Sequence, residues 1–307
     1  MSGVSDAPFR AAVRSYGTGR VVSEMVASAA MVETMRDTRK LRAVFDPKHP
    51  TILQLAGYDP DLLARAVEIA CARGAQAIDL NFGCPARRVV GRAAGSALMR
   101  DGDLCGRIFR AVGRVASVPW SVKMRLGWDH HHLNAPSLAQ MAAGEGASLI
   151  TVHGRTRCQF YKGDADWRAV RAVGGAISIP LIVNGDIANH KDVATALRQS
   201  GAHGYMVGRA AIGRPWLLKA LEAARSGTPW NPSWAEQKQA HVHLLEAMLR
   251  FHGTDLGLKS YRKHLSAWLS NTSNTVAGDQ RRALLTTQTP ASIFRFLDGE
   301  ACQMRAA

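Results

Sequence analysis

Short apolar runs recur along the first two-thirds of the chain, and amphipathic stretches separate them. The runs are rich in Val, Ile and Leu and lie at 21–24, 51–54, 77–80, 120–123, 149–152, 180–183 and 204–207. Between two of them, residues 61–73 place their apolar side chains on one side, which predicts a helix that ends at Gly74. This alternation is typical of a parallel sheet whose strands are connected by helices.

Seven such runs favour a closed (β/α)8 TIM barrel over an open sheet, because that fold holds eight strands in roughly 200 residues or more. The strand without a matching run is the first. A predicted helix from Pro8 to Tyr16, capped by Asp6 or Ser5, comes almost directly after Met1. We therefore expect an α/β barrel with a truncated first strand.

The pattern changes after Gly227, where no further strand-like run occurs. Residues 229–233 have the composition of a linker. Helices are predicted at 235–251 and 258–269, and a last one begins at Pro290. The expected organisation is a barrel domain at 1–228 followed by a small helical bundle at 229–307.

Polar residues follow almost every predicted strand. They are Glu24, Gln54, Asn81, Lys123, His153, Asn184 with Asp186, and Gly208 with Arg209. The carboxyl ends of barrel strands converge on one pocket, so we expect these residues at one mouth. Amide side chains and a lysine suit a flavin ring, and the turns at Gly185 and Gly208 match the usual phosphate site of such barrels.

The turn Asn81-Phe82-Gly83-Cys84-Pro85-Ala86 follows the third run. Gly83 and Pro85 end the strand, so Cys84 is expected on an exposed turn. A cysteine thiol is mostly protonated at neutral pH and can donate a proton. A buried structural cysteine is the alternative. The turn residues on both sides of Cys84 favour a catalytic role over a structural one.

The chain of 307 residues carries 39 Lys and Arg against 24 Asp and Glu, a net charge of +15. Such an excess favours a polyanionic partner, nucleic acid ahead of membrane. Arg155 and Arg157 are candidates to hold a nucleic-acid backbone. Lys259, Arg262 and Lys263 are spaced to share one helix face, although such a face is commonly just solvated.

Five scattered cysteines without a C-x-x-C pair argue against a disulfide scaffold and a zinc ribbon. The histidine run at 130–132 is interpreted as a solvated loop, so we expect no metal site. No apolar run is long enough to cross a membrane, and residues 1–6 do not form a signal peptide. We expect a cytoplasmic protein.

These residues together resemble the bacterial tRNA-dihydrouridine synthases, most closely the B-type subfamily, over nearly the whole chain. The matching stretches are 1–10, 22–25, 54–57, 81–86, 95–98, 122–125, 153–157, 184–186, 208–211, 214–216 and 262–264. The combination of Asn-x-Gly-Cys-Pro at 81–85 with His-Gly-Arg-Thr-Arg at 153–157 is the most specific part.

The resemblance implies FMN in the barrel, NADPH as reductant, and a uridine of the tRNA D-loop as substrate. It implies that Cys84 is the general acid and that the helical domain helps to hold the tRNA. The FMN-binding residues it implies are Gln54, Lys123, His153, Asn184, Gly185, Asp186, Gly208 and Arg209. Asn81 is expected to orient the base, and the protein is expected to be monomeric. One departure concerns an Ala-Pro-Met strand end before Gly3, whose backbone touches the flavin in the family; only its Met1 is present here.

Two alternatives remain at this stage. One is an FMN barrel that handles a free pyrimidine, such as a dihydroorotate dehydrogenase, which needs neither the charge nor the helical domain. The other is a non-catalytic tRNA-binding protein, which would bind tRNA with steep salt dependence but would not bind FMN.

Overall fold

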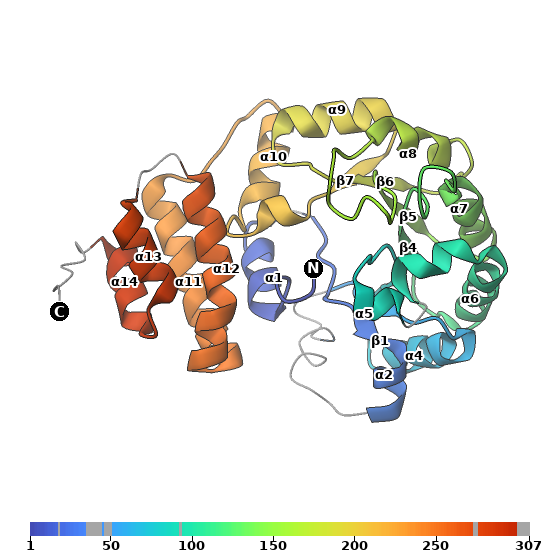
Figure 1. Ribbon diagram of the computed structural model, residues 1–307, viewed down its shortest axis with the longest axis horizontal. Helices are drawn as coiled ribbons and strands as arrows, with labels where there is room; N and C mark the ends of the chain where they lie inside the picture. The colour runs from blue at the N-terminus through green and yellow to red at the C-terminus, as the bar shows by residue number, and fades with distance from the viewer. Residues whose placement is uncertain (18, 35–44, 46–50, 92–93, 273–275, 300–307) are drawn as a thin grey trace. The chain divides into compact units, whose positions relative to one another are not determined.

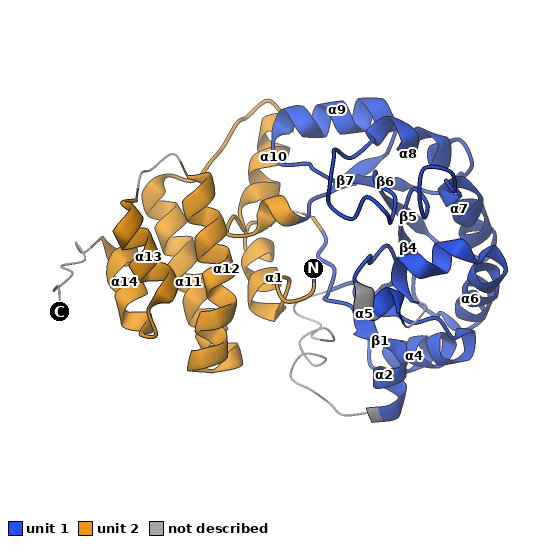
Figure 2. Ribbon diagram, viewed as in Figure 1, with its two compact units in different colours: residues 1, 20–208 blue, residues 2–19, 209–307 orange. Residues whose placement is uncertain are grey.

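The computed structural model describes residues 1–17, 19–34, 45, 51–91, 94–272 and 276–299. The chain divides into two compact units (Figure 2). The sheet unit comprises Met1 and 20–208, and the helical unit comprises 2–19 and 209–307. Residues 2–19 and 209–228, placed with the barrel by the sequence prediction, therefore belong to the helical unit.

The sheet unit holds seven parallel strands that pair in chain order (Figure 1). They are β1 (Val26–Ala27), β2 (Leu53–Ala56), β3 (Ile78–Phe82), β4 (Trp120–Arg125), β5 (Leu149–His153), β6 (Leu181–Asn184) and β7 (Gly204–Met206). The connecting helices are α2 (Ser28–Thr34), α4 (Pro60–Ala72), α5 (Arg87–Val90), η1 (Gly95–Arg100), α6 (Gly102–Val115), α7 (Ala135–Gly144), α8 (Trp167–Gly174) and α9 (His190–Ser200). This order confirms the predicted α/β fold of TIM-barrel type.

The strand predicted at 21–24 is reduced to a single bridge between Val22 and Ile52, and regular pairing begins only at β1. The reason lies in the buried Ser23, which is 2% exposed. Its hydroxyl donates to the Glu24 carbonyl at 2.7 Å and accepts from the Gln54 N–H at 2.9 Å. A side chain thus takes one of the hydrogen bonds that a regular ladder would make.

Helix α4 shows how the pattern of the sequence becomes structure. Asp59 caps its first turn by accepting from the Leu62 N–H at 2.9 Å, and Pro60 occupies the first helical position. The apolar face predicted from the sequence is buried and includes Leu63 and Val67. Strands β2 and β3 are buried along their whole length, as expected for a sheet covered on both faces.

The helical unit contains α1 (Ala7–Arg14), η2 (Arg209–Ala211), α10 (Leu217–Arg225), α11 (Trp234–His252), α12 (Thr254–Asn271), α13 (Gly278–Thr286) and α14 (Pro290–Asp298). The helices predicted at 235–251 and 258–269 lie within α11 and α12. A capping box of Ser233 and Glu236 starts α11. At the centre Trp268, 1% exposed, stacks on His241 with 4.0 Å between ring centroids.

Candidate active site

Three polar side chains on β2 and β3 form a buried hydrogen-bonded chain. Asp79 Oδ2 accepts from Gln54 Nε2 at 2.8 Å, and Gln54 Oε1 accepts from Asn81 Nδ2 at 2.8 Å. Asp79 is 3% exposed, Gln54 8% and Asn81 9%. The predicted residues Gln54 and Asn81 are thus adjacent, and Asp79 joins them from within the strand.

Lys123 lies on the neighbouring strand β4, and its Nζ donates to Asn184 Oδ1 on β6 at 2.9 Å. The amide of Asn184 in turn donates to the Met206 carbonyl at 2.8 Å. Burial lowers the pKa of Lys123 to about 8, although the nearby Asp79 opposes the shift. Burial also raises the pKa of Asp79 to about 6, against its hydrogen bonds to Gln54 and Ser121. Both groups therefore titrate near neutral pH.

The backbone of Cys84 is held from two sides. Its N–H donates to Asn81 Oδ1 at 2.9 Å, and its carbonyl accepts from the N–H of Ser96 at 3.1 Å and from the Ser96 hydroxyl at 2.9 Å. Gly95 has φ +64°, and a Cβ there would lie 2.8 Å from the Cys84 carbonyl oxygen. Only glycine permits this approach. Cys84 is half-buried, so it is less exposed than the sequence predicts, and its backbone is held in place directly after β3.

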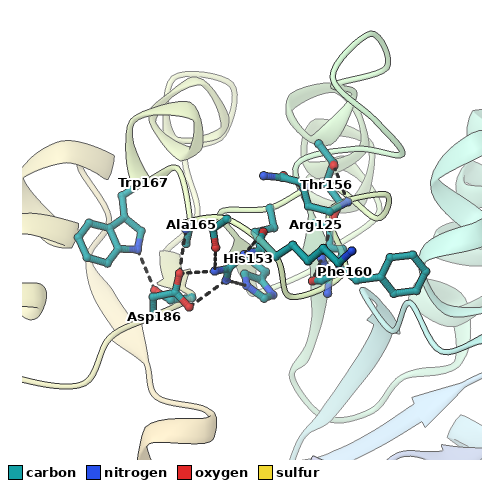
Figure 3. Close-up of polar contacts among 12 residues, drawn as sticks. Arg125, His153, Thr156, Phe160, Ala165, Trp167 and Asp186 are labelled. Atoms are coloured by element: carbon teal, nitrogen blue, oxygen red, sulfur yellow. Dashed lines mark hydrogen bonds and ion pairs between the residues drawn. The ribbon is translucent and has the colours of Figure 1, made fainter.

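Arg125, at the end of β4, connects this turn to the loop after β5. Its Nε donates to the Gly83 carbonyl at 2.8 Å, and its Nη1 donates to the carbonyls of Thr156 at 2.7 Å and Phe160 at 2.9 Å. The side chain is 1% exposed, and burial lowers its pKa to about 10. Figure 3 shows Arg125 beside Thr156 and Phe160.

The structure does not support the nucleic-acid contact predicted for Arg155. This side chain is 2% exposed, and its guanidinium forms a two-pronged pair with the carboxylate of Asp186, one arm at 2.9 Å (Figure 3). It also donates to the carbonyls of Lys162 and Gly163. Arg155 therefore holds the 155–163 loop in place, because each nitrogen of its guanidinium has a partner within the protein.

His153 ends β5, and its Nε2 lies 3.2 Å from Arg155 Nη1. Gly185 has φ +115°, and a Cβ there would lie 2.8 Å from His153 Cδ2. The Trp167 indole donates to the Gly185 carbonyl at 2.9 Å (Figure 3). Asp166 caps α8. Asp166 and Trp167 therefore make structural contacts, one as a helix cap and the other through its indole N–H.

The other residues predicted to bind FMN are divided between the two units. Gly208 ends the sheet unit and has open space where a Cβ would be, whereas Arg209 begins the helical unit in η2. Met1 belongs to the sheet unit and is 38% exposed. Asp186, also predicted to bind FMN, has its carboxylate engaged by Arg155 and by the Ala165 N–H at 2.8 Å.

Arg157 is half-buried between two rings of the sheet unit. Its guanidinium carbon lies 4.5 Å from the centroid of the Trp128 ring and 4.7 Å from that of Phe160. Arg100 lies 4.8 Å from the Trp128 centroid.

The adjacent histidine run forms a turn in which Asp129 accepts from His132 Nδ1 at 2.7 Å. Among the described residues, no group of three or more His, Cys, Asp or Glu is arranged to hold a metal.

The predicted basic stripe on α12 is interrupted. Lys259 is exposed, and so is Lys263, whose Nζ donates to the Gly3 carbonyl at 2.8 Å. Arg262 is half-buried and donates to the Thr287 carbonyl and to Gln288 Oε1. The three residues follow one another at the predicted spacing on α12, but the connection between α13 and α14 binds the Arg262 guanidinium, so Lys259 and Lys263 are the more exposed members.

Three contributors to the site were not identified from the sequence: Asp79, Ser96 and Arg125. Asp79 could have been identified from the sequence, since a carboxylate inside the apolar run 77–80 requires a partner once the strand is buried. Ser96 and Arg125 lie within matching stretches, but the pattern alone does not say that they hold backbone carbonyls.

Comparison with known proteins gives one family. The family model for dihydrouridine synthase (Dus) matches residues 1–302. A probable tRNA-dihydrouridine synthase of Rickettsia conorii is 46% identical over 278 residues, which are 90% of this chain and 84% of that protein. The one of Rhodobacter capsulatus is 42% identical over 100% of this chain and 94% of its own length. The tRNA-dihydrouridine synthase B of Pseudomonas aeruginosa is 40% identical over 88% of this chain and 82% of that protein.

Proposed function

The chain belongs to the dihydrouridine synthase family, and we propose that it reduces a uridine of the tRNA D-loop to 5,6-dihydrouridine with FMN as cofactor and NADPH as reductant. The observation that carries the proposal is the thiol of Cys84, held on a fixed turn at the end of β3. Asn81 lies on β3 itself, and Gln54 and Lys123 lie on the adjoining strands β2 and β4, a set of two amides and one cation.

The donors at these strand ends fit a flavin. Within the described part of the chain, Asn184 Oδ1 is the one hydrogen-bond acceptor of Lys123 Nζ, so two of the three ammonium protons remain for a ligand. An ammonium with such spare donors suits the electron-rich pyrimidine end of an isoalloxazine ring. We propose that Gln54, Lys123, His153, Asn184 and the backbone at 185 and 208 hold FMN.

When bound, FMN supplies the hydride for C6 of the uracil. The target base must leave its stack to reach the pocket. Lys123 and Asn81 then orient the uracil, and Cys84 Sγ donates a proton to C5 from the other face. A thiol on a rigid turn suits this step because the proton must arrive at one carbon from one direction.

The net charge of +15 supports a polyanionic substrate. We propose that exposed cations of the helical unit, including Lys259 and Lys263, contact tRNA phosphates, and that Arg157 with its two rings contacts the RNA near the pocket. Among the helices of the described residues, none is long and apolar enough to span a bilayer. A cytoplasmic location is part of the proposal.

Substitution of Cys84 tests the proposed function. Cys84→Ala should retain flavin absorbance and tRNA binding, whereas dihydrouridine formation under NADPH should fall about 10²–10⁴-fold, the contribution of one general acid. Cys158→Ala is the matched control, since Cys158 is an exposed thiol of the same unit. Unchanged turnover in the Cys84 variant would overturn the assignment. Reduction of free uracil or orotate in preference to tRNA would overturn the assignment of tRNA as the substrate.

A further inference from the structure

One uninterrupted series of hydrogen bonds runs from the interior of the sheet to the cysteine turn. It starts at Ser121 Oγ, 2.7 Å from Asp79 Oδ1, and continues through Asp79 Oδ2 to Gln54. From Gln54 it passes to Asn81, whose Oδ1 accepts from the N–H groups of Gly83 at 3.1 Å and Cys84 at 2.9 Å. We call this series the amide chain.

The direction of the amide chain is fixed by its two ends. The backbone N–H groups of Gly83 and Cys84 can only donate, so Asn81 must turn its oxygen toward them. Its Nδ2 therefore faces Gln54, which must present Oε1 and send Nε2 the other way. That Nε2 requires an acceptor, because an unpaired buried donor is costly. Asp79 Oδ2 supplies it.

We propose that Asp79 is a positioning residue that sets the direction of the Gln54 and Asn81 amides and, through them, fixes the turn that carries Cys84. The inference rests on the proposed function for the role of Cys84 as acid. Asp79 acts through its neighbours, because it lies within β3 and is 3% exposed.

The protonation state of Asp79 does not reverse the amide chain. As a carboxylate it accepts from both Gln54 and Ser121. As an acid protonated at Oδ1 it donates to Ser121 Oγ, which then donates to the Ile78 carbonyl, 3.3 Å away. Oδ2 remains an acceptor in both states. An asparagine at this position reproduces the second arrangement, whereas leucine removes the acceptor at nearly the same volume.

The rate of Cys84 alkylation tests the proposal. Purified wild-type protein, Asp79→Asn and Asp79→Leu are treated with iodoacetamide, and modification of each cysteine is followed by peptide mass spectrometry. Asp79→Leu should accelerate alkylation of Cys84 about tenfold, because removing the buried acceptor of Gln54 Nε2 eases opening of the turn. Asp79→Asn should keep the wild-type rate. The exposed Cys158 in the same samples should react equally in all three.

An equal acceleration in Asp79→Asn and Asp79→Leu would overturn the proposal, since charge and not amide direction would then be responsible. A wild-type rate in Asp79→Leu would overturn it as well. Should Asp79→Leu fail to fold, Gln54→Leu breaks the next link and should give the same acceleration of Cys84 alone. Alkylation needs neither tRNA nor reductant, so a failure of Cys84 to act on uridine would contradict the proposed function and leave this result standing.

Discussion

Both units bury polar groups, but they use them differently. In the helical unit His241 Nε2 donates to the Gly213 carbonyl at 2.9 Å, while the Gly213 N–H donates to His264 Nδ1 at 3.2 Å. The series ends at another buried side chain of the same unit, because Nδ1 of His241 accepts from the Tyr261 hydroxyl at 2.9 Å. In the sheet unit the amide chain instead ends on the turn of a half-buried thiol.

The pKa shifts show the same difference. Burial lowers the pKa of His241 to about 3 and that of His264 to about 4, which keeps both rings neutral across the working range. Two groups of the sheet unit have shifted pKa values on either side of pH 7, Asp79 at about 6 and Lys123 at about 8. The two buried rings of the helical unit therefore keep one charge state around pH 7, whereas Asp79 and Lys123 change charge state near it, as is common at functional sites.

The largest effect is expected on acidification. An unfolded histidine takes up a proton near pH 6.5 and these folded ones do not, so stability falls as pH drops from about 6.5 toward 4, by roughly 1.4 kcal/mol per pH unit for each ring. Protonated His264 would also point a proton at the Gly213 N–H. The melting temperature, measured by circular dichroism, should fall steeply as the pH is lowered over this range.

His264→Asn keeps an acceptor for Gly213 and does not titrate, so it should remove about half of that pH dependence and leave the part due to His241. His243→Gln on the exposed face of α11 is the control and should leave it unchanged. A melting curve that is independent of pH between 6.5 and 4 in the wild-type protein would contradict the burial of two neutral rings.

Next in size is the loss of the Arg155 guanidinium. Arg155→Met removes the guanidinium from the Asp186 carboxylate and leaves the carbonyls of Lys162 and Gly163 without this donor. Because the Asp186 side chain is 29% exposed, the loss comes mainly from the carbonyls and is about 2–3 kcal/mol. Urea unfolding should show this loss, and Arg168→Met, at an exposed position of α8, should be nearly neutral. Equal effects of the two substitutions would mean that Arg155 does not hold the loop.

A smaller effect of opposite sign is expected for Asp79→Asn. Because the folded pKa of Asp79 is raised above the ordinary 3.8, its contribution to stability declines as pH rises from about 4 to about 6. The asparagine does not carry this cost, so it should increase the free energy of unfolding by about 1–3 kcal/mol at pH 7 and leave it unchanged at pH 4. Asp164→Asn, on an exposed loop, is the control for denaturant titrations at both pH values.

The smallest effect concerns the exposed end of α12. If Lys259 contacts one phosphate, Lys259→Ala should weaken tRNA binding only modestly and reduce the slope of log affinity against log salt by about 1. Lys259→Arg should restore both. Filter-binding titrations at several salt concentrations measure the slope, and an unchanged slope would remove Lys259 from the tRNA-binding surface.

Much of the fold could be predicted from the sequence because it depends on periodicity. The apolar runs became strands β2 to β7, and polar residues at their ends lie where parallel strands place them. The roles of charged residues could not be predicted in the same way. Arg155 and Arg262 look like surface cations in the sequence, and only the folded chain shows the carboxylate or carbonyls that bind them. The strand predicted at 21–24 is reduced to a single bridge, because the Ser23 side chain takes a hydrogen bond that a regular ladder would make.

Arg125 has a consequence for how a ligand would be received. One guanidinium joins the turn after β3 to the loop after β5 through three carbonyl oxygens. The two segments therefore shift together or not at all. If a nucleotide binds here as proposed, it meets segments that are already held in place, so little conformational freedom is lost on association and recognition depends on fit more than on closure.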